Sequence, residues 1–192
     1  FLNSSEDILK KIKYLNLQLN NTNKNNLIFF EGDIRDKDTL RNVFKYALKV
    51  DAPIDIVIHL AGLKSVSESE RNKMLYWDIN YKGSKNLIKI MEENNCFSLI
   101  FSSSATIYGV SKLSGESLCH YYHNKFGIDV RSLRYPGLIG WESMPGGGTT
   151  DYAVDIFHEA IKNGKYNCFL SEDRFLPMMY MDDAIDATIN IM

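Results

Sequence analysis

The segment FSLIFSSSATIYGVSKLSGE, Phe97–Glu116, decides the fold because it joins a strand to a helix through a short turn. Its first part, Phe97–Ser103, is apolar and ends in serines, which is typical of a buried strand that stops at a surface. A helix is expected to follow over about Gly109–Phe126. A strand–turn–helix unit of this kind is the building block of parallel sheets.

The same alternation continues on both sides of this segment. Ile54–Leu60 is an apolar, β-branched run and predicts a strand buried on both faces. Right-handed crossovers between such strands give a parallel sheet with helices on both faces, so we predict an α/β, Rossmann-like doubly wound fold. The other expected strands are Leu27–Phe30, Val130–Arg134 and Tyr166–Leu170. The other expected helices are Ser5–Leu19, Asp38–Val50, Ser69–Asn94, Asp151–Asn163 and Met181–Met192.

The composition indicates an ordinary globular protein. The chain has 192 residues, of which 45% are hydrophobic, and a net charge of −2, which argues against nucleic-acid or membrane-surface partners. No stretch is apolar enough to span a bilayer and none has the form of a signal peptide, so we expect a cytoplasmic protein. Cys96, Cys119 and Cys168 fit neither a disulfide framework nor a metal site, and we expect three unreactive thiols.

Ligands of open parallel sheets bind outside the carboxyl ends of the strands. The residues at these positions are therefore the candidates for a site. They are Gly32-Asp33-Ile34, Leu60-Ala61-Gly62, Ser102–Ser104 and Pro136-Gly137.

Tyr108 and Lys112 are four residues apart and share one face of a helix. An ammonium beside a phenol lowers the pKa of the phenol and makes it a usable general base. Ser104, at the neighbouring strand end, could hydrogen-bond the substrate oxygen. The alternative is a surface pair of no consequence, but the apolar strand ending in three serines favours the catalytic interpretation.

Two further features have alternative interpretations. The loop PGGGTT, Pro145–Thr150, precedes a helix, and it is either a plain cap or a nest of N–H groups and hydroxyls suited to a carboxylate. His59 lies in an expected strand and is predicted to be a hydrogen-bonded core histidine rather than a ligand. No metal site is expected.

Long stretches resemble the extended short-chain dehydrogenases/reductases. The first ~109 residues resemble UDP-glucose 4-epimerases, and the last ~84 resemble L-threonine 3-dehydrogenases of the short-chain type. The first resemblance rests on Asn3-Ser4, GDIRD (Gly32–Asp36), IDIVIHLAGLKSVSES (Ile54–Ser69) and IFSSSATIYG (Ile100–Gly109). The second rests on YGVSK (Tyr108–Lys112), HNKFGIDVRSLRYPGLIG (His123–Gly140), PGGGTTDYAVDIFHEAI (Pro145–Ile161) and LPMMYMDDAIDATINIM (Leu176–Met192).

The resemblance implies a nicotinamide cofactor, NAD with NADP not excluded, and assigns residues to it. Ser104, Tyr108 and Lys112 would be catalytic, and Ser103, Ser104, Gly148, Thr149 and Thr150 would bind the substrate. The cofactor contacts would be Asn3, Ser4, Asp33, Ile34, Leu60, Ala61, Gly62, Lys64, Asn80, Tyr108, Lys112, Tyr135 and Pro136. The glycine-rich G-x-G-x-x-G turn of these families does not occur, and we expect it to belong to a first βα unit that would precede Phe1.

The two resemblances meet at Tyr108-Gly109. In both families some twenty residues separate the serine-rich strand end from the Tyr-x-x-x-Lys helix, whereas here one Tyr-Gly pair serves both. A true fusion is sterically allowed, because four residues span at most about 14 Å. We expect instead that residues are missing between Ile107 and Val110, or that the chain is assembled from two sources.

These observations lead to three hypotheses. The first is an NAD-dependent oxidoreductase of the L-threonine 3-dehydrogenase type, and the second is a UDP-sugar epimerase that uses the same residues. The third is an inactive fragment or chimera. We expect an incomplete NAD-binding core over 1–140, a partial substrate-binding region over 141–192, a small-molecule substrate (L-threonine or a UDP-sugar) and a homodimer.

Overall fold

The computed structural model describes residues 6–19, 27–105, 109–141 and 151–192. Contacts divide the chain into two compact units, Phe1–Gly32 and Asp33–Met192. The predicted division at residue 140 is not tested by this and stays a prediction. Six predicted site residues lie outside the described residues: Asn3, Ser4, Tyr108, Gly148, Thr149 and Thr150.

The first unit contains helix α1, Glu6–Leu19, which confirms the predicted helix. The predicted strand Leu27–Phe30 is wrong, because this segment belongs to neither sheet of the described chain. Its side chains Ile28, Phe29 and Phe30 are 40–51% exposed. Strand composition alone does not make a strand, since a strand forms only within a hydrogen-bonded ladder.

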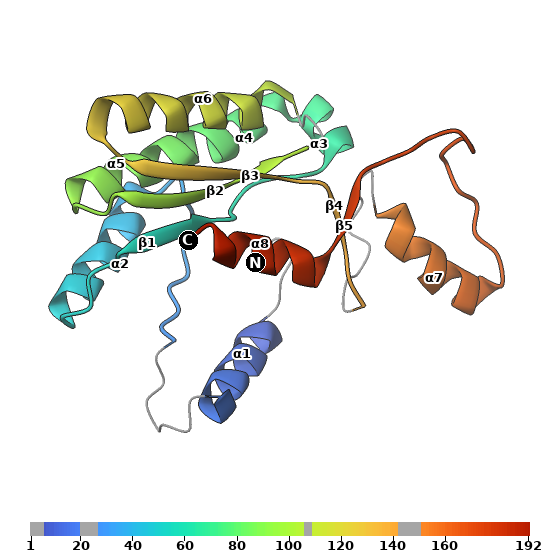
Figure 1. Ribbon diagram of the computed structural model, residues 1–192, viewed down its shortest axis with the longest axis horizontal. Coiled ribbons are helices and arrows are strands. Elements are labelled where there is room, and N and C mark those ends of the chain that lie inside the picture. Colours follow the sequence, from blue (N-terminus) through green and yellow to red (C-terminus); the bar gives the residue numbers. More distant parts are fainter. Residues whose placement is uncertain (1–5, 20–26, 106–108, 142–150) are drawn as a thin grey trace. The chain divides into compact units, whose positions relative to one another are not determined.

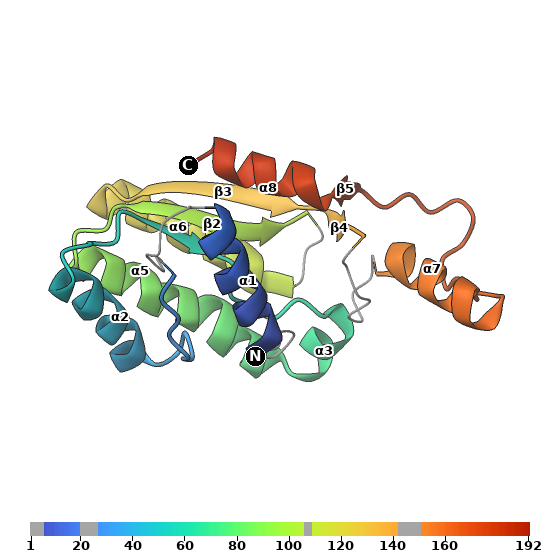
Figure 2. The ribbon, with the colours of Figure 1, turned by 90° about the horizontal axis from the view of Figure 1, so that it is seen from below.

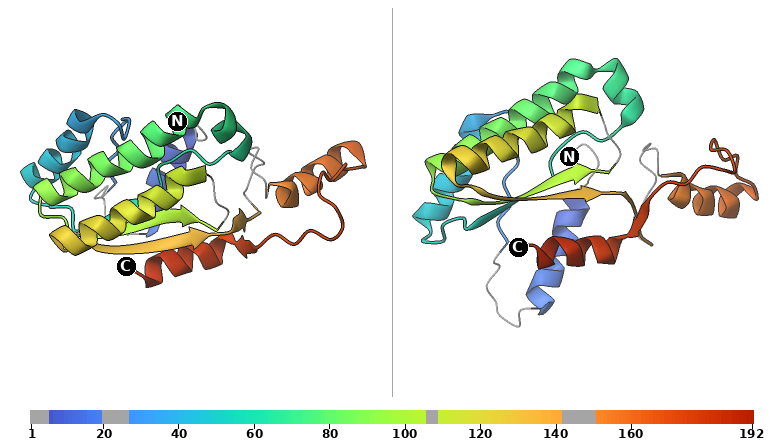
Figure 3. Two further views of the ribbon diagram at one scale, coloured as in Figure 1. Left: turned by 90° about the horizontal axis from the view of Figure 1, so that it is seen from above. Right: turned by 45° about the horizontal axis from the view of Figure 1, so that its top comes forward.

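The second unit is built on a parallel sheet of β1 (Ile56–His59), β2 (Ser98–Ser104) and β3 (Asp129–Tyr135), in the order β1-β2-β3. Ser98 of β2 pairs with Ile56 of β1 and with Asp129 of β3, which sets the register. In Figure 1 the helices α5 (Ser84–Glu93) and α6 (Gly109–Phe126) lie on one face of this sheet, and α8 (Met181–Asn190) lies on the other. Figure 2 shows α2 (Lys37–Lys49) on the same side as α5. The predicted α/β fold is confirmed, as the oblique view in Figure 3 also shows.

The central strand β2 carries the core. Leu99 and Phe101 are each 1% exposed and pack against Ile88 and Met91 of α5. The prediction that Ile54–Leu60 is buried on both faces is wrong, because Ile58 of β1 is 40% exposed. His59, on the opposite face, is buried, and Val57 on that face is partly buried, so the two faces of β1 are covered unequally.

The single helix predicted over Ser69–Asn94 is divided into several elements. They are α3 (Val66–Arg71), α4 (Lys73–Tyr76), the π-helical segment η1 (Trp77–Gly83) and α5. The first turn begins early because the Ser65 hydroxyl accepts a hydrogen bond from the Glu68 N–H, which caps α3. Wide π-helical turns inside helices often occur at functional sites.

A second, two-stranded parallel sheet consists of β4 (Gly137–Ile139) and β5 (Met178–Tyr180). It was not predicted, because three-residue strands are too short to show a period, and the strand expected over Tyr166–Leu170 is wrong. Helix α7, Tyr152–Asn163, is confirmed and ends at Gly164. Figure 2 shows β4, β5 and α7 beyond the end of the main sheet. None of the helices in the described ranges combines the length and the apolar character needed to cross a membrane.

Candidate functional site

A cleft lies at the carboxyl ends of β1, β2 and β3. It brings together predicted site residues from four separate segments of the chain, as expected for strands that run in parallel. The lining residues are Leu60, Gly62, Leu63, Lys64, Ser102, Ser103, Ser104, Lys112, Tyr135, Pro136, Leu138 and Asp151.

Lys112 is one of three charged residues that line this cleft, together with Lys64 and Asp151. Its Nζ donates a hydrogen bond to the Ser102 carbonyl oxygen at 2.8 Å and lies 5.5 Å from the centre of the Phe101 ring. Burial lowers the pKa of Lys112 below its ordinary value, because the charged form loses hydration. An ammonium has three donors, and the hydrogen bond to Ser102 O uses one of them.

Gly62 keeps the wall of the cleft open beside this ammonium. A Cβ at Gly62 would lie 3.3 Å from Lys112 Nζ and 3.0 Å from Asn80 Oδ1. Asn80 is 2% exposed, accepts a hydrogen bond from Leu63 N at 2.8 Å and donates to Leu63 O at 3.1 Å. In the described geometry Asn80 therefore holds the loop after β1, and a direct contact of Asn80 with a cofactor stays a prediction.

The serines that end β2 have different surroundings. Ser103 is 5% exposed, and its hydroxyl donates to the carboxylate of Glu116. Ser104 is half-buried and lines the cleft. Side chains alternate along a strand, so Ser104 and Ser103 belong to opposite faces of β2. Within the described ranges, Ser103 is thus the predicted substrate-binding serine whose hydroxyl is engaged by another side chain, whereas Ser104 has no such side-chain contact there.

A series of buried hydrogen bonds links His59, Ser84 and Asn80 next to the cleft. Ser84 Oγ donates to Asn80 O at 2.5 Å, so His59 Nε2 must be the donor in its 2.8 Å contact with Ser84 Oγ. Burial, and then the charge of Lys112, lower the pKa of His59 to about 4. His59 is neutral at pH 7, and the prediction of a hydrogen-bonded core histidine is confirmed.

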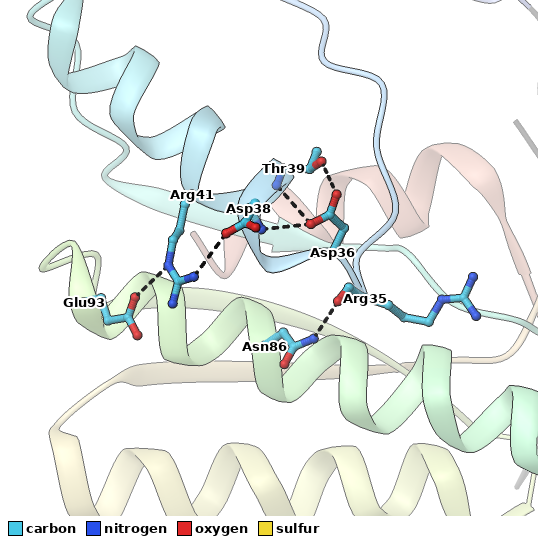
Figure 4. Close-up of polar contacts among 7 residues, drawn as sticks. All are labelled: Arg35, Asp36, Asp38, Thr39, Arg41, Asn86 and Glu93. Carbon is cyan, nitrogen blue, oxygen red and sulfur yellow. Dashed lines mark hydrogen bonds and ion pairs between the residues drawn. The ribbon is translucent and has the colours of Figure 1, made fainter.

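Asp33 and Ile34 lie on the loop before α2, away from the cleft lining. Arg35 donates to both oxygens of the Asp33 carboxylate, and these hydrogen bonds hold the pKa of Asp33 below its ordinary value. Figure 4 shows how the loop is anchored: Asp36 caps α2, and Asn86 of α5 donates to the Arg35 carbonyl oxygen at 3.1 Å. The loop is thus fixed to α5 by a contact within the protein.

Tyr135 ties the end of β3 to α8. Thr188 Oγ1 donates to Ala184 O at 2.6 Å, so the Tyr135 hydroxyl is the donor in its 2.5 Å contact with Thr188. The phenol oxygen of Tyr135 is therefore engaged away from the cleft, while Tyr135 and Pro136 form part of the cleft wall.

The two buried cysteines have the unreactive character expected of them. Cys96 and Cys119 are buried, whereas Cys168 is exposed. Burial raises the pKa of Cys119 to about 12 and raises that of Cys96 as well. Thiolates at these two positions are negligible at pH 7.

The cleft fits the ribose end of a nicotinamide dinucleotide. Gly62 leaves the surface beside the Lys112 ammonium bare, and that ammonium has donors suited to ribose hydroxyls. Lys64 adds a positive charge to the same wall, which suits a pyrophosphate. The described residues would thus hold the ribose end, while the sequence contains no G-x-G-x-x-G turn for the phosphates.

Several residues of the site were not predicted from the sequence. Leu63, Leu138 and Asp151 line the cleft, and Glu116 and Arg134 form an ion pair behind it, with Arg134 Nη2 2.6 Å from Glu116 Oε2. Glu116 follows Lys112 by four residues on the same helix, and this spacing is the signal that could have found it.

The sequence matches the NAD dependent epimerase/dehydratase family in two segments, residues 9–110 and 105–192. The segments overlap on the stretch where two motifs share Tyr108 and Gly109. An uncharacterized epimerase/dehydratase from Staphylococcus haemolyticus is 41% identical over 161 residues, which is 72% of this chain and 49% of the relative. The chain spans about half the length of the curated relatives it matches.

Two solved structures are also similar. A GalE-like L-threonine dehydrogenase from Cupriavidus necator (holo form) is 32% identical, with a TM-score of 0.80 over 100% of this chain and 70% of that one. A UDP-glucose 4-epimerase of Thermus thermophilus in complex with NAD is 22% identical, with a TM-score of 0.74 over 87% of this chain and 60% of that one, a likeness that shows the fold alone. The family match extends over most of the chain, and this chain belongs to the NAD-dependent epimerase/dehydratase family.

Proposed function

We propose that this chain is part of an NAD-dependent oxidoreductase of the L-threonine 3-dehydrogenase type, which oxidises a secondary alcohol to a ketone. The observation that carries the proposal is the Lys112 ammonium, held between Ser102 O and Gly62 at the base of a cleft that Ser104 also lines. The similarity to the C. necator threonine dehydrogenase over the whole chain supports the choice of substrate.

The chain's own residues divide the chemistry between them. Lys112 donates to the ribose and, through its charge, lowers the pKa of the phenol of Tyr108, four residues before it in the sequence. Tyr108 takes the proton of the substrate hydroxyl, and Ser104 donates a hydrogen bond to the oxygen as it becomes a carbonyl. NAD, when bound, supplies the nicotinamide C4 that accepts the hydride from the hydroxyl carbon. Gly148, Thr149 and Thr150 bind the substrate carboxylate.

The remaining predicted contacts complete the proposed cofactor site. Asp33 and Ile34 would contact the adenine, Leu60, Ala61 and Gly62 would contact the ribose and pyrophosphate, and Lys64 would offset phosphate charge. The homodimer stays a proposal that rests on family resemblance alone, and sedimentation velocity of the purified chain tests it.

Absorbance at 340 nm tests the proposal directly. The chain is mixed with L-threonine and NAD, and in parallel with NADP, and we expect NADH to accumulate with a rate that depends on L-threonine. Ser104→Ala should lower kcat at least ~10-fold, while Ser117→Ala, an exposed serine on α6, is the matched control.

The alternative activity, sugar-nucleotide epimerisation, gives a different product. An epimerase converts UDP-galactose to UDP-glucose without net NADH, which chromatography of the nucleotide sugars detects. Conversion of UDP-galactose with no reaction of L-threonine would replace the proposal by the epimerase. Absence of both reactions would leave the inactive fragment or chimera.

A further inference from the structure

Helix α6 is fixed to the end of β2 by residues one turn apart on one face. Lys112 donates to Ser102 O, and Glu116 accepts the Ser103 hydroxyl. Between them Gly115 lies against the Phe101 ring so closely that a Cβ would come within 2.7 Å of Phe101 Cζ. The helix therefore contacts three consecutive strand residues, Phe101, Ser102 and Ser103, which leaves little freedom for it to slide or rotate.

Glu116 extends this attachment to the next strand. Arg134 of β3 donates from Nε to Glu116 Oε1 at 2.9 Å and from Nη2 to Oε2 at 2.6 Å. The Glu116 side chain is 19% exposed although Arg134 is 61% exposed, so the carboxylate is the shielded partner. A bidentate pair of this kind fixes orientation as well as distance. One carboxylate thus joins α6, β2 and β3 directly behind the cleft.

We propose that Glu116 is a positioning residue of this site: it sets the placement of α6 against β2 and β3, and thereby the position of Lys112 relative to Ser104. The activity test of this role depends on the proposed function, whereas the titration of Lys112 does not. Ser103 acts with Glu116 as part of this attachment, and Ser104 is left to face the substrate.

A second arginine–carboxylate pair on β3 provides the matched control. Arg131 Nη2 lies 2.7 Å from Asp129 Oδ2, and both side chains are about half exposed. These residues are two apart on one strand, although Arg131 also donates to Ile191 O and Met192 O after α8. Asp129→Asn removes a pair of the same chemistry, and the α6 residue that Asp129 affects, His123, is about three helical turns from Lys112. Exposed pairs contribute little to stability, and no effect on the site is expected.

The test compares Glu116→Ala, Glu116→Gln, Ser103→Ala and Asp129→Asn in the full chain. Glutamine at position 116 keeps an oxygen that can accept the hydrogen bond from Ser103. Glu116→Gln should therefore retain part of the attachment of α6 to β2 that Glu116→Ala loses. The readout is the titration of Lys112 itself, followed by competitive acetylation with acetic anhydride over a pH series, with the exposed Lys89 as reference in the same digest. A helix that is no longer fixed admits water to Lys112, which raises its pKa toward the ordinary value.

We expect the Lys112 pKa to rise in Glu116→Ala, to rise less in Ser103→Ala and Glu116→Gln, and to stay unchanged in Asp129→Asn. Far-UV circular dichroism establishes folding, and if Glu116→Ala does not fold, the two milder variants decide. An unchanged Lys112 titration in folded Glu116 and Ser103 variants overturns the proposal, as does an equal shift in Asp129→Asn.

Activity provides a second arm. In Glu116→Ala, kcat should fall at least ~10-fold with KM for L-threonine within ~2-fold, because misplacement affects the reacting geometry more than binding. If the wild-type chain forms no NADH, that result counts against the proposed function, and the Lys112 titration still decides the role of Glu116.

Discussion

At the scale of single residues, the candidate site consists of the Lys112 ammonium and the side chains around it. Lys112 was predicted as a functional residue from its spacing to Tyr108, and the carboxyl-end rule placed Gly62 and Ser104 in the same cleft. Lys64, which also lines the cleft, was predicted from the resemblance to UDP-glucose 4-epimerases. The direction of the Ser103 hydroxyl could not be predicted, because its partner Glu116 comes from another element and is itself held by a third.

Replacement of Lys112 by Met should leave the stability of the chain nearly unchanged. The ammonium loses hydration on burial, and its one recorded hydrogen bond, to Ser102 O, offsets that loss. We expect the free energy of unfolding of Lys112→Met at pH 7 to lie within about 1 kcal/mol of the wild type by urea denaturation. A loss above ~3 kcal/mol would show that the ammonium is structural rather than kept for a ligand.

Because His59 is buried in its neutral form, we expect the folded chain to lose stability at acid pH. Its pKa falls from about 6.5 to about 4 on folding, so between these values the unfolded chain binds more protons than the folded one. Stability contributed by neutral His59 is full above pH 6.5 and is lost as pH falls toward 4, by about 3 kcal/mol. Urea denaturation gives the free energy of unfolding of the wild type and of His59→Gln over pH 4–7. The difference between the two proteins at each pH isolates His59, because the other titratable groups are common to both. Parallel pH profiles of the two proteins would contradict it.

At the scale of elements, the prediction succeeded where an element is long and its period is clear. Helices α2, α6 and α7 and strands β2 and β3 lie within a residue or two of their predicted bounds. The β4–β5 pair depends on tertiary contacts, such as the hydrogen bond from Gly137 N to Pro177 O, which local sequence does not encode. The early start of α3 has a local signal that the prediction missed, because Ser65 caps Glu68 N in a Ser-x-x-Glu pattern.

The packing of α6 on β2 depends on Gly115 having no side chain. In Gly115→Ala the added methyl group would meet the buried Phe101 ring, and overpacking of this kind costs about 1–3 kcal/mol. The gain in helix propensity, about 1 kcal/mol, offsets only part of that cost. We expect a lower melting temperature for Gly115→Ala and an unchanged or higher one for Ser117→Ala on the exposed face of the same helix. A stabilised Gly115→Ala would show that α6 is not in tight contact with β2.

At the scale of the whole molecule, the chain spans about half the length of its curated relatives and exposes much apolar surface. On α7, Phe157 and Ile161 are 68% and 87% exposed, and Trp141 and Phe175 are 82% and 93% exposed. Trp141, Phe157 and Ile161 line one hollow, and soluble monomers rarely expose large contiguous apolar patches. Sequence patterns showed that these residues are apolar but not that they remain uncovered.

Exposed apolar surface should make the isolated chain bind hydrophobic dyes. We expect strong 8-anilinonaphthalene-1-sulfonate fluorescence from the folded chain, reduced in the Phe157→Lys, Ile161→Lys double variant. Asn163→Lys adds the same kind of charge to α7 without removing apolar area and should leave the fluorescence as it is. Weak dye binding by the wild type would mean that the α7 surface is covered, for example by self-association, which light scattering would detect.

The most direct measurement is a calorimetric titration of NAD into the wild-type chain and into Lys112→Met. We predict saturable heat with the wild type and a Kd at least ~10-fold weaker for Lys112→Met, a difference of about 1.4 kcal/mol in binding free energy. Absence of binding to the wild type, or equal Kd values for two equally folded proteins, would contradict the assignment of this cleft to the cofactor.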